Sequence, residues 1–178
     1  MKEEIRLAGS GGQGVILASI ILADAAVLSG NNATQSQAYG PEARGGACKA
    51  EVVISDERIR FGKVLKPSFL LALNQKAADT FAKDLPKETI VMLDESITTP
   101  EGLKENTVIR LPILETAKEK VGKAFTANIV AVGAINNVLH LCDSDTLFEA
   151  VKLHIPKGTE EINLKALSEG EKLGGSHE

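Results

Sequence analysis

Short apolar runs and longer helical patterns alternate along the chain. Apolar runs predict buried strands at 5–8, 70–73, 89–93 and 108–113, and the polar stretch 31–37 is a further short-strand candidate. Apolar positions with helical spacing predict helices at 14–28, 75–85, 114–121, 127–141, 146–152 and 160–173. This alternation predicts a three-layer α/β/α fold with a Rossmann-like, mostly parallel sheet.

Three segments add detail to this prediction. Segment 47–55 alternates apolar and polar residues and precedes a Ser-Asp-Glu-Arg turn, so we expect it to form an antiparallel hairpin with 59–61. Helix 14–28 is apolar in nearly every direction, which predicts cover by its own sheet and by a second element, for which another subunit is a candidate. Within 127–141, Gly133 is expected to permit close approach of another backbone.

The length and composition indicate one globular domain with an aliphatic core. The chain has 178 residues, of which 43% are hydrophobic, and its aromatic residues are one Tyr and five Phe with no Trp. We expect a single domain over 1–178 with a flexible tail at 174–178. The net charge of -4 argues against nucleic-acid binding, and nothing in the sequence supports a membrane role. The N-terminus has no signal-peptide pattern, so a cytoplasmic location is expected.

Residues with catalytic or metal-binding chemistry are sparse. Cys48 and Cys142 form no CxxC motif and are too few to hold an iron–sulfur cluster or a structural zinc unaided. We expect both to be structural, with His140 and Cys142 on one helix but facing different directions. The three histidines share no metal-ligand spacing, and the flanks of Ser10 are not GxSxG. The sequence therefore predicts no catalytic residue and no metal site.

The glycine-rich segment GSGGQG follows the first strand and precedes the first helix. Gly9, Gly11 and Gly14 have GxGxxG spacing, so backbone amides at the helix N-terminus could bind a phosphate or another anion. A dinucleotide site would add a carboxylate about 20 residues further on, but 31–37 contains none. Two interpretations stay open, an anion site and a tight turn in which Gln13 satisfies loose backbone groups. A Walker loop is excluded because no Lys-Ser or Lys-Thr pair follows.

A second segment, YGPEARGG at 39–46, has the strongest functional character. It places a phenol, a carboxylate and a guanidinium in a loop shaped by glycines and a proline. Arg44 is suited to bidentate contact with a carboxylate or phosphate. The alternative is a Glu42–Arg44 arrangement that only fixes the loop.

The two segments together resemble the gamma subunit of the 2-oxoacid:ferredoxin oxidoreductases, which act on pyruvate, 2-oxoglutarate or 2-ketoisovalerate. Ala127-Asn128, and Asn163 with Ala166 and Gly170, are similar to later positions of that family, so the resemblance covers essentially the whole chain. It implies an oxidoreductase that decarboxylates a 2-oxoacid to an acyl-CoA and reduces ferredoxin or flavodoxin. The resemblance also implies that thiamine diphosphate and the iron–sulfur clusters lie mainly on alpha, beta and delta subunits. The chain contains no GDG thiamine motif, so alone it is expected to bind no cofactor and to be inactive.

By this resemblance, the chain packs against the catalytic subunits and is a candidate to help bind coenzyme A. The candidate residues for contact with coenzyme A, another anion or a partner subunit are Gly9, Gly11, Gly12, Gln13, Gly14, Tyr39, Gly40, Pro41, Glu42, Arg44, Gly45, Gly46 and Asn128. Three alternatives remain: a stand-alone nucleotide-binding enzyme of Rossmann type, an accessory subunit of indolepyruvate oxidoreductase, and a purely structural spacer. Nicotinamide or flavin binding by the isolated chain would favour the first.

Overall fold

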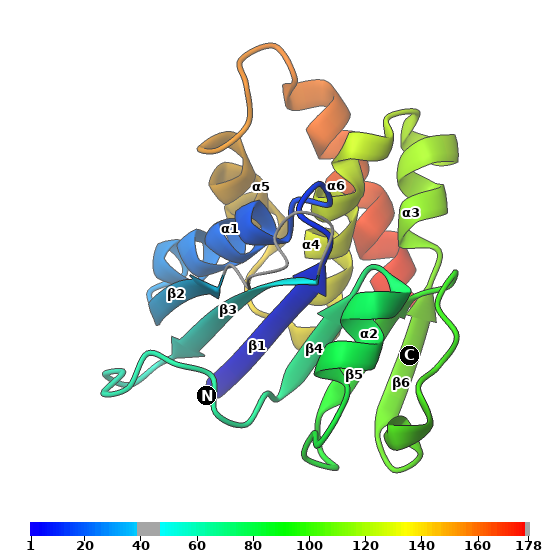
Figure 1. Ribbon diagram of the computed structural model, residues 1–178. Coiled ribbons are helices and arrows are strands. Elements are labelled where there is room, and N and C mark those ends of the chain that lie inside the picture. Colours follow the sequence, from blue (N-terminus) through cyan, green and yellow to red (C-terminus); the bar gives the residue numbers. More distant parts are fainter. Residues whose placement is uncertain (39–46, 177–178) are drawn as a thin grey trace.

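The computed structural model describes residues 1–38 and 47–176 and shows a six-stranded mixed sheet with helices on both faces (Figure 1). The strands are β1 Lys2–Gly9, β2 Asn32–Ala38, β3 Cys48–Ser55, β4 Phe69–Ala72, β5 Ile90–Asp94 and β6 Thr107–Leu111. The α-helices are α1 Val15–Leu28, α2 Gln75–Phe81, α3 Ile113–Glu115, α4 Ala127–Leu139, α5 Ser144–Lys152 and α6 Glu160–Gly175. Three short helical segments complete the chain: η1 Glu101–Leu103, η2 Thr116–Val121 and η3 Ala124–Thr126.

The strand order is β2-β3-β1-β4-β5-β6, and the predicted fold class is confirmed. Strands β1, β4, β5 and β6 pair in parallel, whereas β3 is antiparallel to both β1 and β2. The predicted hairpin of 47–55 with 59–61 is wrong, because β3 pairs with β1 over its whole length and residues 59–61 form no strand. β3 is buried because it lies between its two partners, β1 and β2. A hairpin arm of three residues would be too short to bury it.

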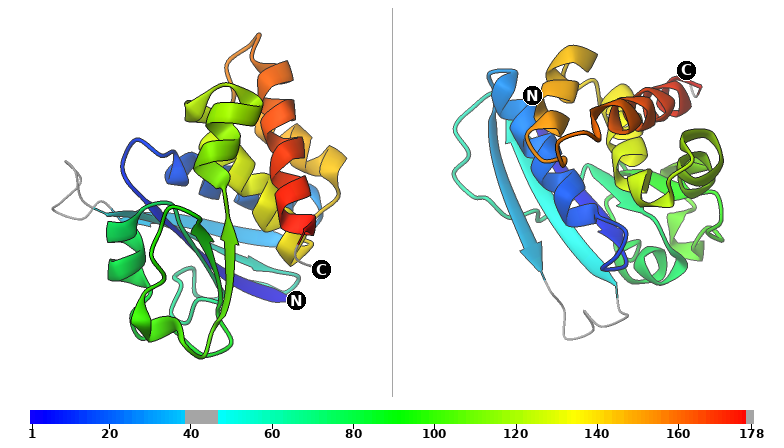
Figure 2. Two further views of the ribbon diagram at one scale, coloured as in Figure 1. Left: turned by 90° about the vertical axis from the view of Figure 1, so that its right-hand side faces the viewer. Right: turned by 90° about the horizontal axis from the view of Figure 1, so that it is seen from above.

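Two apolar cores lie on opposite faces of the sheet (Figure 2). Ile5 and Leu7 of β1 face the larger core, which they share with α1, α4, α5 and α6. Ala8 faces the smaller core, which includes residues of α2 and η1. This division follows from the alternation of side chains along a strand. Among the described residues, no helix is long and apolar enough to cross a membrane.

The apolar helix α1 is covered by its own chain on both sides. One face packs on the sheet, and α4 and α5 pack against the other, so the suggestion that another subunit provides the second cover is wrong. The Asp24 carboxylate Oδ2 lies 2.5 Å from Nε2 of His154, which joins α1 to the end of α5. The most exposed apolar side chains of α1 are Val27 and Leu28 at its C-terminal end, and Leu17 near its start is partly exposed.

Two helices, α2 and α4, end earlier than their apolar patterns predict. Helix α2 stops at Phe81, and α4 stops at Leu139 because His140 adopts a left-handed conformation with φ of 50°. His140 and Cys142 therefore do not share a helix, contrary to expectation. The Asn136 side chain fixes this end, since its Nδ2 donates to the Cys142 carbonyl and its Oδ1 accepts from the Cys142 amide.

Helices α4 and α6 pack at very short range, side by side in both views of Figure 2. A Cβ atom at Gly133 would lie 2.3 Å from the Leu167 carbonyl oxygen, and one at Gly170 would lie 2.0 Å from the Val130 carbonyl oxygen. A Cβ at Gly174 would lie 2.8 Å from the Ala134 carbonyl oxygen. The prediction that Gly133 permits close backbone approach is confirmed. We call these three glycines the α4–α6 seam.

Candidate functional site

The glycine-rich turn joins β1 to α1 at the carboxyl edge of the parallel strands. Open α/β sheets usually bind their ligands at this edge. Gly14 caps the N-terminus of α1 with φ of 72° and ψ of 22°, a left-handed conformation that favours glycine. The chain can therefore leave β1 and enter α1 within five residues, which places the exposed Gly11 and Gly12 at the tip of the turn.

Gln13 holds the turn from inside. Its Oε1 accepts hydrogen bonds from the Ser10 amide at 2.8 Å and from Nδ2 of Asn74 at 3.1 Å, while its Nε2 donates to the Leu73 carbonyl at 3.0 Å. Asn74 also caps α2, because its Oδ1 accepts from the Ala77 amide. Gln13 thus connects the turn after β1 to the turn after β4. Sequence reasoning missed Asn74, for which the signal was an asparagine directly before a helix.

Asn128 reaches the turn from the N-terminus of α4. It is buried, its Nδ2 lies 3.4 Å from the Gly14 carbonyl oxygen, and its Oδ1 accepts from the Ile129 amide. A Cβ at Gly14 would lie 2.7 Å from Nδ2 of Asn128, so a larger residue here would have to displace the Asn128 side chain as well as adopt the left-handed conformation. The structure brings together Gly14 and Asn128, which are 114 residues apart in sequence.

The first turn of α1 has backbone donors without a partner in the described part of the chain. Among the described residues, the first-turn amides of Val15, Ile16 and Leu17 have no acceptor, whereas the Ala18 amide bonds to Gly14. A Cβ at Gly12 would meet no atom of residues 1–38 or 47–176 within 4 Å. Free amides at a helix N-terminus, beside an open glycine, are suited to an oxyanion such as a phosphate.

The second motif begins and ends at the same edge. Ala38, the last residue of β2, aligns with Lys49 of β3, and Cys48 aligns with Gly9 of β1. The two strands that flank 39–46 therefore reach the sheet edge beside the glycine turn, within two strand spacings or roughly 10 Å. The candidates Tyr39, Gly40, Pro41, Glu42, Arg44, Gly45 and Gly46 themselves lie outside the described residues.

The geometry disfavours a dinucleotide site. In that site a carboxylate at the end of the neighbouring parallel strand binds the ribose. Here β3 separates β1 from β2, and the parallel neighbour of β1 is β4, which ends at Ala72 and leads into Leu73 and Asn74. The Ser10 amide is also already occupied by Gln13.

The described residues show no reactive thiol and no cluster suited to a metal. Burial raises the pKa of the Cys48 thiol, and burial together with the nearby Asp143 carboxylate raises the pKa of Cys142 to about 11. Both thiols are therefore protonated near neutral pH, and protonated thiols are poor nucleophiles. No group of three or more His, Cys, Asp or Glu side chains among the described residues could hold a metal ion.

The fold and site define an α/β protein with a glycine turn and free helix-α1 amides at the carboxyl edge of its sheet. Residues 4–173 match the profile of the family described as pyruvate ferredoxin/flavodoxin oxidoreductase, and the chain belongs to this family. It is 44% identical to 2-oxoglutarate synthase subunit KorC of Methanocaldococcus jannaschii, over 96% of this chain and 92% of that protein. The resemblance to gamma subunits is thereby confirmed.

Two solved structures share this fold, and the more similar of them in sequence also supports the assignment. The gamma subunit of a keto/oxoacid ferredoxin oxidoreductase from Geobacter sulfurreducens is 37% identical, with a TM-score of 0.88 over 99% of this chain and 98% of that chain. The 2-oxoglutarate:ferredoxin oxidoreductase of Magnetococcus marinus, solved with 2-oxoglutarate, coenzyme A and succinyl-CoA bound, is 22% identical with a TM-score of 0.90. That likeness shows the fold alone, and it spans 99% of this chain but 32% of the larger one.

Proposed function

We propose that this chain, as one gamma-type domain over 1–178, serves a multi-subunit enzyme that oxidatively decarboxylates 2-oxoglutarate. We choose 2-oxoglutarate as the substrate because of the 44% identity to a 2-oxoglutarate synthase subunit across nearly the full length of both chains. The pyruvate synthase subunit PorC of Methanothermobacter marburgensis is 32% identical over a similar span. In the reaction the 2-oxoacid loses carbon dioxide, its acyl group passes to coenzyme A, and two electrons pass to ferredoxin or flavodoxin.

The partners in this proposal are alpha, beta and delta subunits, or equivalent domains of a fused chain, in the cytoplasm. Thiamine diphosphate and iron–sulfur clusters belong to those partners. Fusion has a parallel in the ketoisovalerate oxidoreductase subunit VorA of Methanothermobacter thermautotrophicus, of which this chain matches 35% at 37% identity. A domain of this type therefore forms part of a longer polypeptide in that relative.

The role proposed for this chain is to bind an anionic part of coenzyme A, or a partner carboxylate, at the glycine turn. The free amides of Val15, Ile16 and Leu17 would hold a phosphate, and the open side of Gly12 would let it approach. Gln13 and Asn128 would act as positioning residues, because they fix the turn from inside. Arg44 would supply a second, bidentate contact.

Co-purification followed by an assay tests the proposed function. A tagged form of the chain, expressed in its native host, is expected to purify with thiamine- and cluster-bearing subunits. The complex should reduce ferredoxin or a viologen dye only when 2-oxoglutarate and coenzyme A are both present, with a higher kcat/KM for 2-oxoglutarate than for pyruvate. Calorimetry of the isolated chain with NAD and FAD should show no binding. Nicotinamide or flavin binding without partners would instead favour a stand-alone enzyme.

Arg44→Ala tests the contribution of the second motif. Losing one charge-assisted contact of about 1.5–3 kcal/mol predicts a roughly 10- to 100-fold lower kcat/KM for coenzyme A in the reconstituted complex. Arg58→Ala removes the same charge from an exposed position away from the sheet edge and should leave kcat/KM unchanged. Arg44→Ala with unchanged activity and unchanged affinity for the partner subunits would exclude Arg44 from the site.

A further inference from the structure

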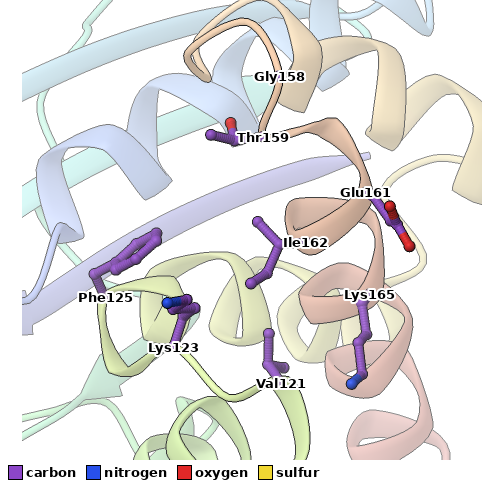
Figure 3. Close-up of a pocket in the computed structure, with 8 residues that line it drawn as sticks. All are labelled: Val121, Lys123, Phe125, Gly158, Thr159, Glu161, Ile162 and Lys165. Carbon is purple, nitrogen blue, oxygen red and sulfur yellow. The ribbon is translucent and has the colours of Figure 1, made fainter.

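A groove lies on the helical side of the molecule, between η3 and the start of α6 (Figure 3). Its volume is about 550 Å³, and Val121 and Ile162 form part of its apolar floor. A second hollow of about 240 Å³, lined by Leu17 and other apolar residues, shares Phe125 and Thr159 with the first. We call the two together the Phe125 groove. Asn128, which contacts Gly14, also lines the smaller hollow, so the Phe125 groove adjoins the glycine turn.

Phe125 is the most prominent apolar feature of this groove. Its side chain is 69% exposed, in a chain that has only five phenylalanines. Its backbone is fixed nonetheless, because the amide and the hydroxyl of Thr126 both donate to the Lys123 carbonyl. An exposed aromatic ring on a rigid short helix is typical of the anchor residues that dominate protein interfaces.

The groove also carries unpaired positive charge. Lys123 and Lys165 line it, and neither forms an ion pair with any described residue. Glu161 lies in the same groove, but Figure 3 shows its carboxylate pointing away from Lys123 and Phe125. Lys165 is near enough to Glu169 to help lower the pKa of that carboxyl, but neither lysine is held in an ion pair with a residue that the structure describes. Two such lysines beside apolar surface favour a partner that brings carboxylates.

Asn163 leaves one acceptor available at the floor of the smaller hollow. The residue is 5% exposed, and its Nδ2 donates to the carbonyl and the hydroxyl of Thr159. Its Oδ1 accepts no hydrogen bond from the described residues. No buried side-chain polar atom of the described residues lacks a partner, so this Oδ1 is open to solvent, and a backbone N–H of a docked segment can replace water as its donor.

We propose that the Phe125 groove docks a segment of a catalytic partner subunit. The segment carries an aliphatic side chain, which packs on Phe125, Val121 and Ile162, and a carboxylate that pairs with Lys123 and Lys165. One of its backbone N–H groups donates to Oδ1 of Asn163. This proposal rests on the proposed function, because it needs the partner subunits of that enzyme, and it goes beyond it by naming the contact surface.

The test measures the affinity of the purified chain for its catalytic subunits, once these have been separated from the native complex. Phe125→Ala should weaken binding about 30-fold, as expected for an interface anchor. The double variant Lys123→Glu/Lys165→Glu should weaken it at least about 10-fold and reduce the dependence of the association rate on salt. Both sites are on the surface, so the thermal melting temperature should match that of the wild type.

Matched controls make the same changes elsewhere. Phe61→Ala removes the other strongly exposed phenylalanine, and Lys63→Glu/Lys104→Glu reverses two exposed lysines outside the groove. Both should bind like the wild type. The proposal is overturned if the groove variants bind like their controls, or if they bind normally but raise the KM for coenzyme A or the 2-oxoacid, which would indicate a small-molecule pocket. A wild-type chain that binds no catalytic subunit would instead contradict the proposed function.

Discussion

Two groups of glycines in this molecule use the absence of a side chain in different ways. In the α4–α6 seam, a Cβ at Gly133 or Gly170 would strike the backbone of the facing helix. In the turn between β1 and α1, a Cβ at Gly9 or Gly14 would strike the side chains of Gln13 or Asn128, and one at Gly12 would meet nothing. The seam glycines let two helices touch, whereas the turn glycines are held by side chains and leave one face open.

The difference separates glycines that support the fold from glycines that present a surface. Facing backbones cannot move without displacing a whole helix, so the seam tolerates no added atom. Side chains can change rotamer, so the turn glycines tolerate substitution better than the seam glycines do. A side chain added at the open position, Gly12, should not destabilise the isolated chain. Variants of the two groups should therefore affect stability and assembly to different degrees.

The largest expected effect is in the seam. Gly170→Ala places a methyl group 2.0 Å from the Val130 carbonyl oxygen. Overpacking against backbone should lower the free energy of unfolding by about 3 kcal/mol or more, or prevent folding, as measured by urea denaturation. Gly175→Ala, whose Cβ would meet Asn137 at an ordinary 3.6 Å, serves as the control and should stay close to the wild type. Equal stability of both variants would show that the seam is not closely packed.

A smaller effect is expected at the cap of α1. Gly14→Ala puts an L-residue at φ of 72°, which costs about 1–2 kcal/mol, and adds a clash with Asn128. Truncating the facing side chain relieves the clash but not the conformational cost. In a double-mutant cycle, Gly14→Ala with Asn128→Ala should be more stable than the sum of the single variants predicts, by more than about 0.5 kcal/mol. Additive losses would mean that the two residues do not contact each other.

The next effect concerns the internal support of the turn. Gln13→Ala removes three hydrogen bonds and should lower the free energy of unfolding by about 1–3 kcal/mol. The Ser10 amide should also exchange its hydrogen faster, because Gln13 is its acceptor. Gln13→Glu keeps an acceptor for Ser10 but cannot donate to Leu73, so Ser10 protection should largely return. Unchanged exchange of Ser10 in Gln13→Ala would show that Gln13 does not fix the turn.

The sequence predicted most elements because their signals are local. The strands of the parallel half and the starts of α1, α4 and α6 follow from apolar runs and spacing within one segment. The partners of β3 could not be predicted in the same way, because its pairing with β1 is a contact between distant segments. The early end of α4 could not be predicted either, because it depends on hydrogen bonds from the Asn136 side chain to the backbone of Cys142, beyond the helix.

The sequence identified candidate residues of the site, but it could not predict the contacts among them. The glycine spacing and the resemblance identified Gly14 and Asn128 separately, while their contact depends on how α4 packs beside α1. Under the tight-turn interpretation Gln13 satisfies loose backbone groups, and it does so, but its link to Leu73 and Asn74 requires the β1–β4 pairing. Phe125 and Lys123 gave no signal in sequence, because exposure of an aromatic residue is a property of the folded surface.

Gly12→Val tests most directly whether the glycine turn faces a ligand or partner, when it is measured both in the isolated chain and in the reconstituted enzyme. Because a Cβ at this position meets no atom of the described residues within 4 Å, the free energy of unfolding of the isolated chain should change by less than about 0.5 kcal/mol. In the complex, the added side chain should obstruct the turn and lower kcat/KM for coenzyme A at least about 10-fold, or weaken assembly by the same factor. Wild-type stability together with wild-type activity and assembly would contradict the claim that this turn faces a ligand or partner.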